Sequence, residues 1–297
     1  MGTESTTAQV TPAEFTRSMI DLAQDKGAKL TIASAESLAF EADGVALKCV
    51  RAVDEKGETL EIPATDIVLA AGPWTARLAS KLLGTRAGAA LDIEPRCAIA
   101  LSAPRPLTDY QNHAIYSGCS TSVIFRPSTP ITPHALFTEL TLPSGISVSP
   151  EIYPRPDGTV YMCGDHTDPL RPRPLPTRAA DVTPSPHAVK NQTERLKWLG
   201  GRGFDDVQVE VEQACFRPES RRGKPVIGEL AKGVYIASGH SVWGICNGPG
   251  TGQCMVRIIC SIRRWMLTMC GGGTHLGRCD HFSEYPFPCT VNRMSTI

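Results

Sequence analysis

Several features that define whole classes of proteins are missing from this sequence. Lysine and arginine number 30 and so do aspartate and glutamate, so there is no net charge to attract nucleic acid or an anionic membrane surface. No run approaches the roughly 18 apolar residues of a membrane-spanning helix, and residues 1–10 lack the apolar core of a secretory signal peptide. We therefore expect a cytoplasmic protein without membrane insertion, whose partner is a small molecule.

The cysteines also lack the regular pattern of a disulfide framework. Their number, 11, is odd, and the first seven stand singly along the chain, as reduced core thiols do. The remaining cysteines lie after residue 255. A zinc site there is an alternative, but no two of these cysteines have the short spacing of a structural site. Its candidate ligands are Cys260, Cys270, His275, Cys279, His281 and Cys289.

What is present begins with a helix and a β-meander. Thr11 before Pro12, with Glu14 in capping-box position, predicts the start of a helix, and Gly27 predicts its end. Turn signals at Asp43-Gly44 and at 55–57 then separate three β-rich runs, which we expect to form a meander. These runs are residues 30–38, 45–53 and 60–62.

Composition divides the chain into four parts. Residues 1–84 hold the helix, the meander and an apolar strand, and residues 85–206 are proline-rich with antiparallel strand candidates. Residues 207–255 return to strands and glycine turns. Residues 256–297 contain glycine, arginine, cysteine and histidine without a period, and we expect this tail not to fold.

Two segments run from an apolar strand into a glycine turn. They are residues 66–74, Asp-Ile-Val-Leu-Ala-Ala-Gly-Pro-Trp, and residues 233–244, Gly-Val-Tyr-Ile-Ala-Ser-Gly-His-Ser-Val-Trp-Gly. The first is apolar enough to be a parallel strand buried on both faces. Glycine at a strand end lets backbone approach a flat ligand, and open α/β sheets bind ligands at the carboxyl ends of their strands. Either segment alone is also typical of an ordinary β-to-α turn.

A third segment, Gln213-Ala-Cys215-Phe-Arg217-Pro-Glu-Ser, precedes the second glycine turn. With it the chain resembles the D-amino-acid oxidase and sarcosine oxidase superfamily of FAD-dependent oxidoreductases, in matching order from about residue 11 to residue 255. The resemblance implies an α/β (α+β) fold, with a Rossmann-like FAD-binding domain (1–84 and 207–255) interleaved with an antiparallel-sheet substrate domain (85–206).

The resemblance also implies a cofactor and a reaction. FAD would accept hydride from a C–H beside the amine of a small amine or amino acid, and oxygen or another acceptor would reoxidise it. The implied FAD-binding residues are Ala35, Ala70, Ala71, Gly72, Trp74, Cys215, Gly239, Val242, Trp243, Gly244, Ile245 and Cys246.

Three of the implied residues have specific chemical roles. Arg217 would clamp a substrate carboxylate or neighbour the flavin, the alternative being a structural ion pair. Cys215 would attach flavin covalently if Arg217 lowers its pKa, the alternative being a core cysteine. His240 would contact the flavin or move a proton, the alternative being a histidine that only stabilises the turn. Arg217 and His240 are the candidate catalytic residues.

One family motif has no counterpart in these residues. The family holds the FAD pyrophosphate on a Gly-x-Gly-x-x-Gly turn that follows a strand, whereas the glycine clusters at 200–203 and 248–252 have no strand leading directly into them. We therefore expect an N-terminally truncated relative, lacking its first βαβ unit, with impaired FAD binding. The alternatives are a non-enzymatic fragment that binds no flavin and acts at most as an interaction module, and an unrelated nucleotide-using enzyme.

Overall fold

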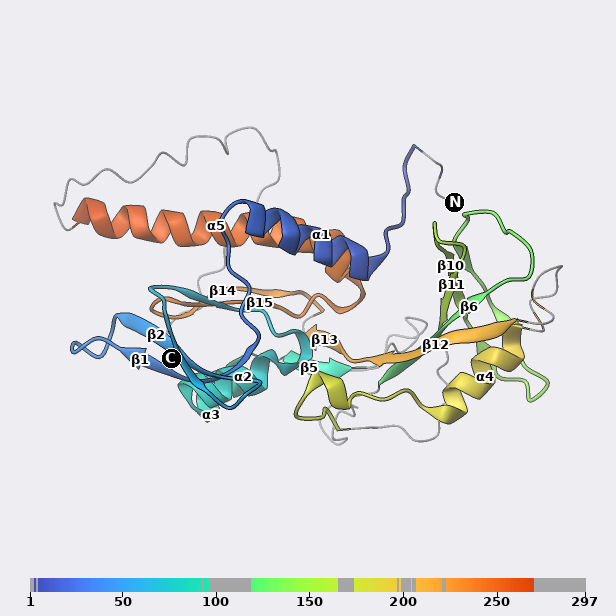
Figure 1. Cartoon of the computed structure of the whole chain (residues 1–297), viewed down its shortest axis with the longest axis horizontal. Helices are drawn as coiled ribbons and strands as arrows, with labels where there is room; N and C mark the ends of the chain where they lie inside the picture. The colour runs from blue at the N-terminus through green and yellow to red at the C-terminus, as the bar shows by residue number, and fades with distance from the viewer. Residues whose placement is uncertain are drawn as a thin grey trace. The chain divides into compact units, whose positions relative to one another are not determined.

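The computed structural model describes residues 3, 5–91, 93–96, 119–164, 174–196, 198, 204, 207–220 and 223–269 (Figure 1). The chain forms two compact units, each built from two stretches of sequence. Unit 1 comprises Met1–Thr31 and Glu94–Arg217, and unit 2 comprises Ile32–Ile93 and Pro218–Ile297. These boundaries differ from the expected ones at 84 and 206. Among the described residues no helix has the length and apolar character needed to cross a membrane.

Unit 1 is built around an antiparallel sheet of five strands. The sheet order is β12-β6-β11-β10-β7, and the separate strands β8 and β9 form a two-stranded hairpin. The helices are α1 (Pro12–Asp25) and α4 (Pro186–Leu196), with a 3₁₀ turn, η3, at Ala179–Asp181. The strands are β6 (Ser120–Arg126), β7 (Leu136–Phe137), β8 (Leu140–Thr141), β9 (Ser147–Val148), β10 (Glu151–Pro154), β11 (Val160–Cys163) and β12 (Gln208–Cys215).

The two faces of this sheet have different neighbours. Helix α4 packs on one face of this sheet (Figure 1). Alternate residues of β6, β10 and β11 point to that face and form an apolar core with Val189 and Leu196. The core residues from the strands are Val123, Phe125, Ile152, Val160 and Met162. Because the side-chain period of a strand is two, the intervening residues must lie on the opposite face.

Helix α1 begins and ends where the sequence predicts. Thr11 precedes Pro12 at the start, and Gly27 adopts a φ of 93° just after the end. The expected capping box is wrong, because the Thr11 side chain makes no capping hydrogen bond. No residue of the helix is buried. The Nε2 of Gln9 ties the segment before α1 to unit 1 by donating to the carbonyl oxygen of Pro154 at 2.9 Å.

Unit 2 contains a meander, a small mixed sheet and three helices. The strands are β1 (Ala33–Phe40), β2 (Leu47–Asp54), β3 (Thr59–Pro63), β4 (Ile67–Leu69), β14 (Val226–Ala231) and β15 (Val234–Ser238). The helices are α2 (Thr75–Leu83), α3 (Thr85–Ala90) and α5 (Gly244–Met269), with 3₁₀ turns η1 (Gly72–Trp74) and η4 (Ser241–Trp243). Two further strands, β5 (Ile93–Arg96) and β13 (Arg217–Ser220), pair at the points where the chain passes between units.

The predicted meander is confirmed. β1, β2 and β3 form an antiparallel sheet in that order. The Asp43-Gly44 turn between β1 and β2 forms because the Asp43 carboxylate accepts hydrogen bonds from the backbone N–H groups of Val45 and Ala46 and Gly44 adopts a φ of 67°. These hydrogen bonds also lower the pKa of Asp43.

The small sheet of unit 2 has the order β14-β15-β4. β4 and β15 are parallel, as expected for these two apolar segments, with Val234 opposite Ile67 and Ile236 opposite Leu69. The expectation that β4 is buried on both faces is wrong, since the Val68 side chain is 40% exposed. Leu69, Val234 and Ile236 form the core of the unit with Ala79 of α2.

Helix α5 extends further than expected. The sequence predicts chain without a fold from residue 256, but the helix begins at Gly244 and continues to Met269. Residues 253–269 contain neither glycine nor proline, so the backbone has no strong helix breaker there. Residues 270–297, with all the zinc candidates except Cys260, lie outside the described residues.

Candidate functional site

The two glycine turns lie at the same edge of the small sheet of unit 2. Because β4 and β15 are parallel and hydrogen-bonded neighbours, their carboxyl ends emerge side by side. Each strand is followed by a glycine with positive φ, Gly72 at 54° and Gly239 at 87°. Each turn then leads through a short 3₁₀ segment into a helix, α2 or α5. The tertiary structure thus brings together two turns that are distant in sequence.

A buried hydroxyl pair links the two turns. The Oγ1 of Thr75, at the start of α2, lies 2.7 Å from the carbonyl oxygen of Gly72 and 3.1 Å from the Oγ of Ser238, the last residue of β15. The Ser238 hydroxyl in turn donates to the Gly72 carbonyl oxygen at 3.0 Å. Both side chains are buried. These contacts fix the first glycine turn against the end of the second strand.

The second turn contains a strained residue. Ser241 has a φ of 50°, a left-handed conformation that few residues other than glycine adopt. Its hydroxyl donates to the Oε1 of Glu219 at 2.9 Å, which stabilises the turn. The Nε2 of the neighbouring His240 lies 2.8 Å from the Oγ1 of Thr251 in α5. Burial lowers the pKa of His240, because the removal of water disfavours the charged imidazolium.

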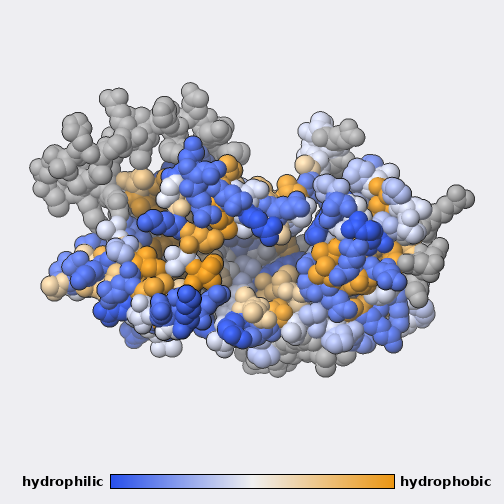
Figure 2. Space-filling model, viewed as in Figure 1, coloured by the Kyte–Doolittle hydropathy of each residue, from blue (hydrophilic) through white to orange (hydrophobic). Residues whose placement is uncertain are grey.

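Large apolar side chains are exposed directly after this turn. The exposed fractions are 49% for Val242, 60% for Trp243 and 37% for Ile245. Figure 2 shows that apolar side chains, in orange, also reach the surface elsewhere on the face in view. Exposed apolar groups beside a backbone turn are a suitable surface for a flat ring, which removes them from water when it binds. The residues present at the turns therefore fit a flavin.

The other positions implied for FAD binding also lie in unit 2, except Cys215. Ala70 and Ala71 connect β4 to the first turn, and Trp74 ends the 3₁₀ segment η1. Gly244 and Cys246 lie in the first turns of α5, where Cys246 is a free, exposed thiol. Ala35 lies in β1, opposite Ala52, next to a register shift. The glycine cluster 248–252 forms part of α5.

Cys215, at the end of β12, and Arg217, at the start of β13, both lie in unit 1. Burial raises the pKa of both Cys215 and Cys163, and the charge of Arg217 opposes this rise at each thiol. For Cys215 the removal of water is the larger effect, and the pKa is raised. The expectation that Arg217 activates Cys215 by lowering its pKa below the ordinary value is therefore wrong. The Cys215 side chain is nevertheless accessible.

Sequence reasoning missed two groups. Thr75 and Ser238, which join the glycine turns, stood within the quoted motifs or beside them but carried no signal, because single hydroxyl residues are common everywhere. The second group lies in unit 1 on the sheet face opposite α4, where Glu151, Tyr153, Tyr161 and Cys163 contact one another. Only the register of β10 and β11 places them together.

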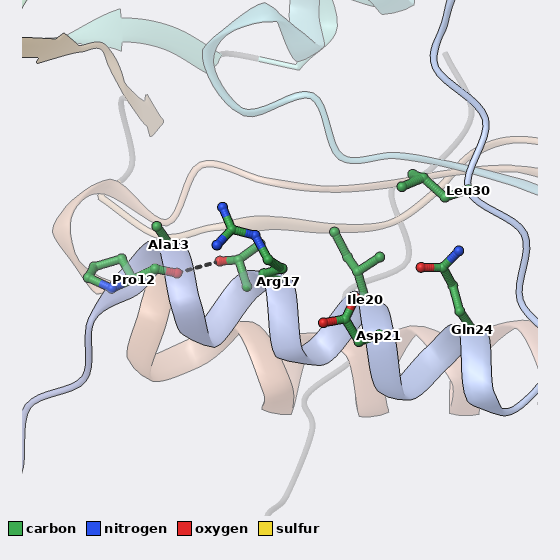
Figure 3. Close-up of a pocket in the computed structure, with 8 residues that line it drawn as sticks. Pro12, Ala13, Arg17, Ile20, Asp21, Gln24 and Leu30 are labelled. Atoms are coloured by element: carbon green, nitrogen blue, oxygen red, sulfur yellow. Dashed lines mark hydrogen bonds between the residues drawn. The ribbon is translucent and has the colours of Figure 1, made fainter.

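A shallow groove of about 590 Å³ lies along α1 and is separate from these groups. Figure 3 shows Pro12, Arg17, Ile20 and Gln24 along the helix, with Leu30 from the following segment nearby. The Thr16 hydroxyl that lines it donates to the carbonyl oxygen of Pro12 at 2.8 Å. The groove contains neither a glycine turn nor any residue implied for FAD binding, so we place the candidate site at the turns.

Solved structures of similar fold include several oxidases and deaminases. L-amino acid deaminase from Proteus vulgaris has a TM-score of 0.52 at 14% identity, over 82% of this chain and 57% of that chain. Iminodiacetate oxidase from Chelativorans sp. BNC1 has a TM-score of 0.51 at 17% identity, over 82% of this chain and 53% of that chain. At these identities the likeness shows the fold, which is mixed α/β as predicted.

Two curated relatives are fungal proteins. The Schizosaccharomyces pombe protein C1F5.03c, named as an oxidoreductase, is 27% identical over 87% of this chain and 61% of its own length. TDA3 of Saccharomyces cerevisiae, also named as an oxidoreductase, is 29% identical over 69% of this chain and 34% of its own length. The chain thus spans less than two thirds of these relatives.

Residues 2–258 match the family described as FAD dependent oxidoreductase, DAO, which includes both glycine turns and the Arg217 segment. The chain therefore belongs to the DAO family of FAD-dependent oxidoreductases.

Proposed function

We propose that this chain is part of an FAD-dependent oxidoreductase that acts on the CH–NH group of a small amine or amino acid. The observation that carries the proposal is the pairing of β4 and β15, which places the Gly72 and Gly239 turns at one sheet edge beside exposed Val242 and Trp243. Bound FAD would supply the acceptor for hydride from the substrate C–H. The backbone of the two turns would hold the FAD, and the exposed apolar side chains would exclude water from one face of the flavin ring.

Two charged or titratable side chains have roles in the proposal. Arg217 would bind the substrate carboxylate, because its planar guanidinium matches a carboxylate in two hydrogen bonds. His240 would accept a proton at Nδ1 in the tautomer in which its Nε2–H donates to the Oγ1 of Thr251. Amino acid and iminodiacetate substrates in the names of the structurally similar enzymes support a small amine substrate.

We also propose that the chain retains FAD more weakly than complete family members do. No Gly-x-Gly-x-x-Gly turn follows a strand in these 297 residues, so the backbone amides that would bind the pyrophosphate are not supplied by this sequence. The competing function is a non-enzymatic fragment that binds no flavin and acts at most as an interaction module. The two differ in one property, flavin binding.

The test is an absorbance spectrum of the purified chain after incubation with FAD and desalting. We expect retained flavin in the wild type and loss in Gly72→Ala and Gly239→Ala. The matched control is Gly57→Ala, because Gly57 also has positive φ and no atom near an added Cβ, but lies in the turn between β2 and β3. A colourless wild type would refute the proposal. Equal loss in the control would mean that general destabilisation, and not the site, removes flavin.

The role of Cys215 is tested in the same samples. If Cys215 attaches flavin, the colour remains with the protein after acid precipitation and Cys215→Ser releases it. Release from the wild type would show that the flavin is held without a covalent bond, which the raised pKa of Cys215 favours.

A further inference from the structure

The face of the unit 1 sheet opposite α4 carries a carboxylate among aromatic rings. Glu151 lies opposite Cys163, and Tyr153 opposite Tyr161, in the antiparallel pair of β10 and β11. Their neighbours in sequence, Ile152, Val160 and Met162, point into the core, so these four side chains share the other face.

Hydrogen bonds hold the Glu151 carboxylate in place. The Tyr153 hydroxyl donates to its Oε2 at 2.7 Å, and the Cys163 thiol lies 3.8 Å from the same oxygen. Among the described residues no lysine or arginine forms an ion pair with Glu151, and no donor reaches its Oε1. One carboxylate oxygen is therefore fixed by the protein while the other remains able to accept a hydrogen bond from a ligand.

The rings beside Glu151 form an aromatic surface that accepts cations. The ring centroids of Phe137 and Tyr153 are 5.8 Å apart, and those of Tyr153 and Tyr161 are 6.0 Å apart. The guanidinium of Arg155 already lies over the Tyr161 ring, 5.3 Å from its centroid. The side chain of Phe137 is 74% exposed. Aromatic rings around a carboxylate are a typical site for ammonium groups.

Charged side chains influence Cys163. Burial raises the pKa of this thiol, the charge of Glu151 raises it further, and the charge of Arg217 opposes both effects. Glu151 and Arg217 do not form an ion pair with each other in the described chain. The described charges on this face are thus the Glu151 carboxylate and the Arg155 guanidinium over the Tyr161 ring.

A carboxylate is unsuited to contact the amine that reacts. Oxidation beside an amine requires the nitrogen lone pair, whereas a neighbouring carboxylate stabilises the protonated ammonium. We propose that Glu151, with Tyr153 and Tyr161, binds a second, non-reacting ammonium group, so that the substrate is an amino acid whose side chain ends in an amine. This inference rests on the proposed function, in which Arg217 binds the carboxylate of the same substrate.

Calorimetric titration of the full chain with racemic lysine and racemic norleucine tests the inference, because norleucine lacks only the side-chain ammonium. We expect lysine to bind at least about ten-fold more tightly, since hydrogen bonds between charged groups are stronger than those between neutral ones. Glu151→Gln should remove this preference. Glu210→Gln is the matched control, because Glu210 lies on β12 and pairs with Arg126 at 2.8 Å, and it should keep the preference.

A second variant tests the aromatic surface. Tyr161→Leu should weaken lysine binding roughly three- to ten-fold and leave norleucine binding unchanged. This variant leaves Glu151 and its hydrogen bond from Tyr153 in place, so it gives an answer even if Glu151→Gln fails to fold.

Three outcomes would overturn the inference: no measurable binding of lysine, equal binding of lysine and norleucine, or a lysine preference that survives in both Glu151→Gln and Tyr161→Leu. Flavin retention in the same samples separates this from the proposed function. A yellow chain without lysine preference refutes only the substrate class. A colourless chain that prefers lysine through Glu151 refutes the proposed function and keeps the ammonium site.

Discussion

Replacing Thr75 with valine tests whether the hydroxyl pair joins the two glycine turns. The change keeps the shape of the side chain but removes the hydroxyl that lies 2.7 Å from the Gly72 carbonyl oxygen and 3.1 Å from the Ser238 Oγ. Thr75 is fully buried, so water cannot replace the lost donor. We expect the free energy of unfolding to fall by about 1–2 kcal/mol and Tm by roughly 2–8 °C.

Thermal unfolding followed by circular dichroism measures this effect. Thr16→Val is the control, because the exposed Thr16 hydroxyl also donates to a backbone carbonyl, that of Pro12 at 2.8 Å, and should change stability by less than about 0.5 kcal/mol. Adding Ser238→Ala completes a double-mutant cycle, and we expect a coupling of about 0.5–1 kcal/mol. A Thr75→Val chain that melts with the wild type, or additive effects of the two changes, would refute the link between the turns.

Two further predictions concern unit 1. Gly164→Ala should destabilise the chain more than Gly145→Ala by over about 1 kcal/mol in urea unfolding: both glycines have positive φ, but only at Gly164 would the added Cβ collide with the backbone of Ser149 and Pro150. Equal losses of unfolding free energy in the two variants would mean that the positive φ, and not the collision of the added Cβ, determines the destabilisation. Burial raises the pKa of Cys163 to about 12 from an ordinary value of 9.0. The stability linked to the buried neutral thiol is therefore fully present below about pH 9 and is lost as pH rises toward 12. Between about pH 8 and about pH 10.5 the free energy of unfolding should fall by roughly 1–2 kcal/mol more in the wild type than in Cys163→Ala. Parallel losses in the two chains would contradict the raised pKa.

Local signals in the sequence determined several elements of both units. The Asp43-Gly44 turn is formed by an aspartate that bonds the next backbone N–H groups and a glycine that adopts positive φ, and both properties are visible without a fold. The proline at the start of α1 and the glycine just after its end are likewise recognisable in the sequence without a fold. The strand-glycine motifs at 66–74 and 233–244 were found for the same reason, and with Arg217 they indicated the family.

The tertiary structure alone decided which segments meet. The pairing of β4 with β15 joins residues far apart in the chain, and no local pattern specifies the hydroxyl contacts of Thr75 or the face that Glu151 shares with Tyr161. The sequence analysis did not predict β6, the strand between β12 and β11. Ser120, Thr121 and Ser122 look too polar for an interior strand, yet all three are buried. They are stable there because the Thr121 hydroxyl accepts a hydrogen bond from the Ser185 N–H and its carbonyl oxygen accepts one from Gln192 of α4.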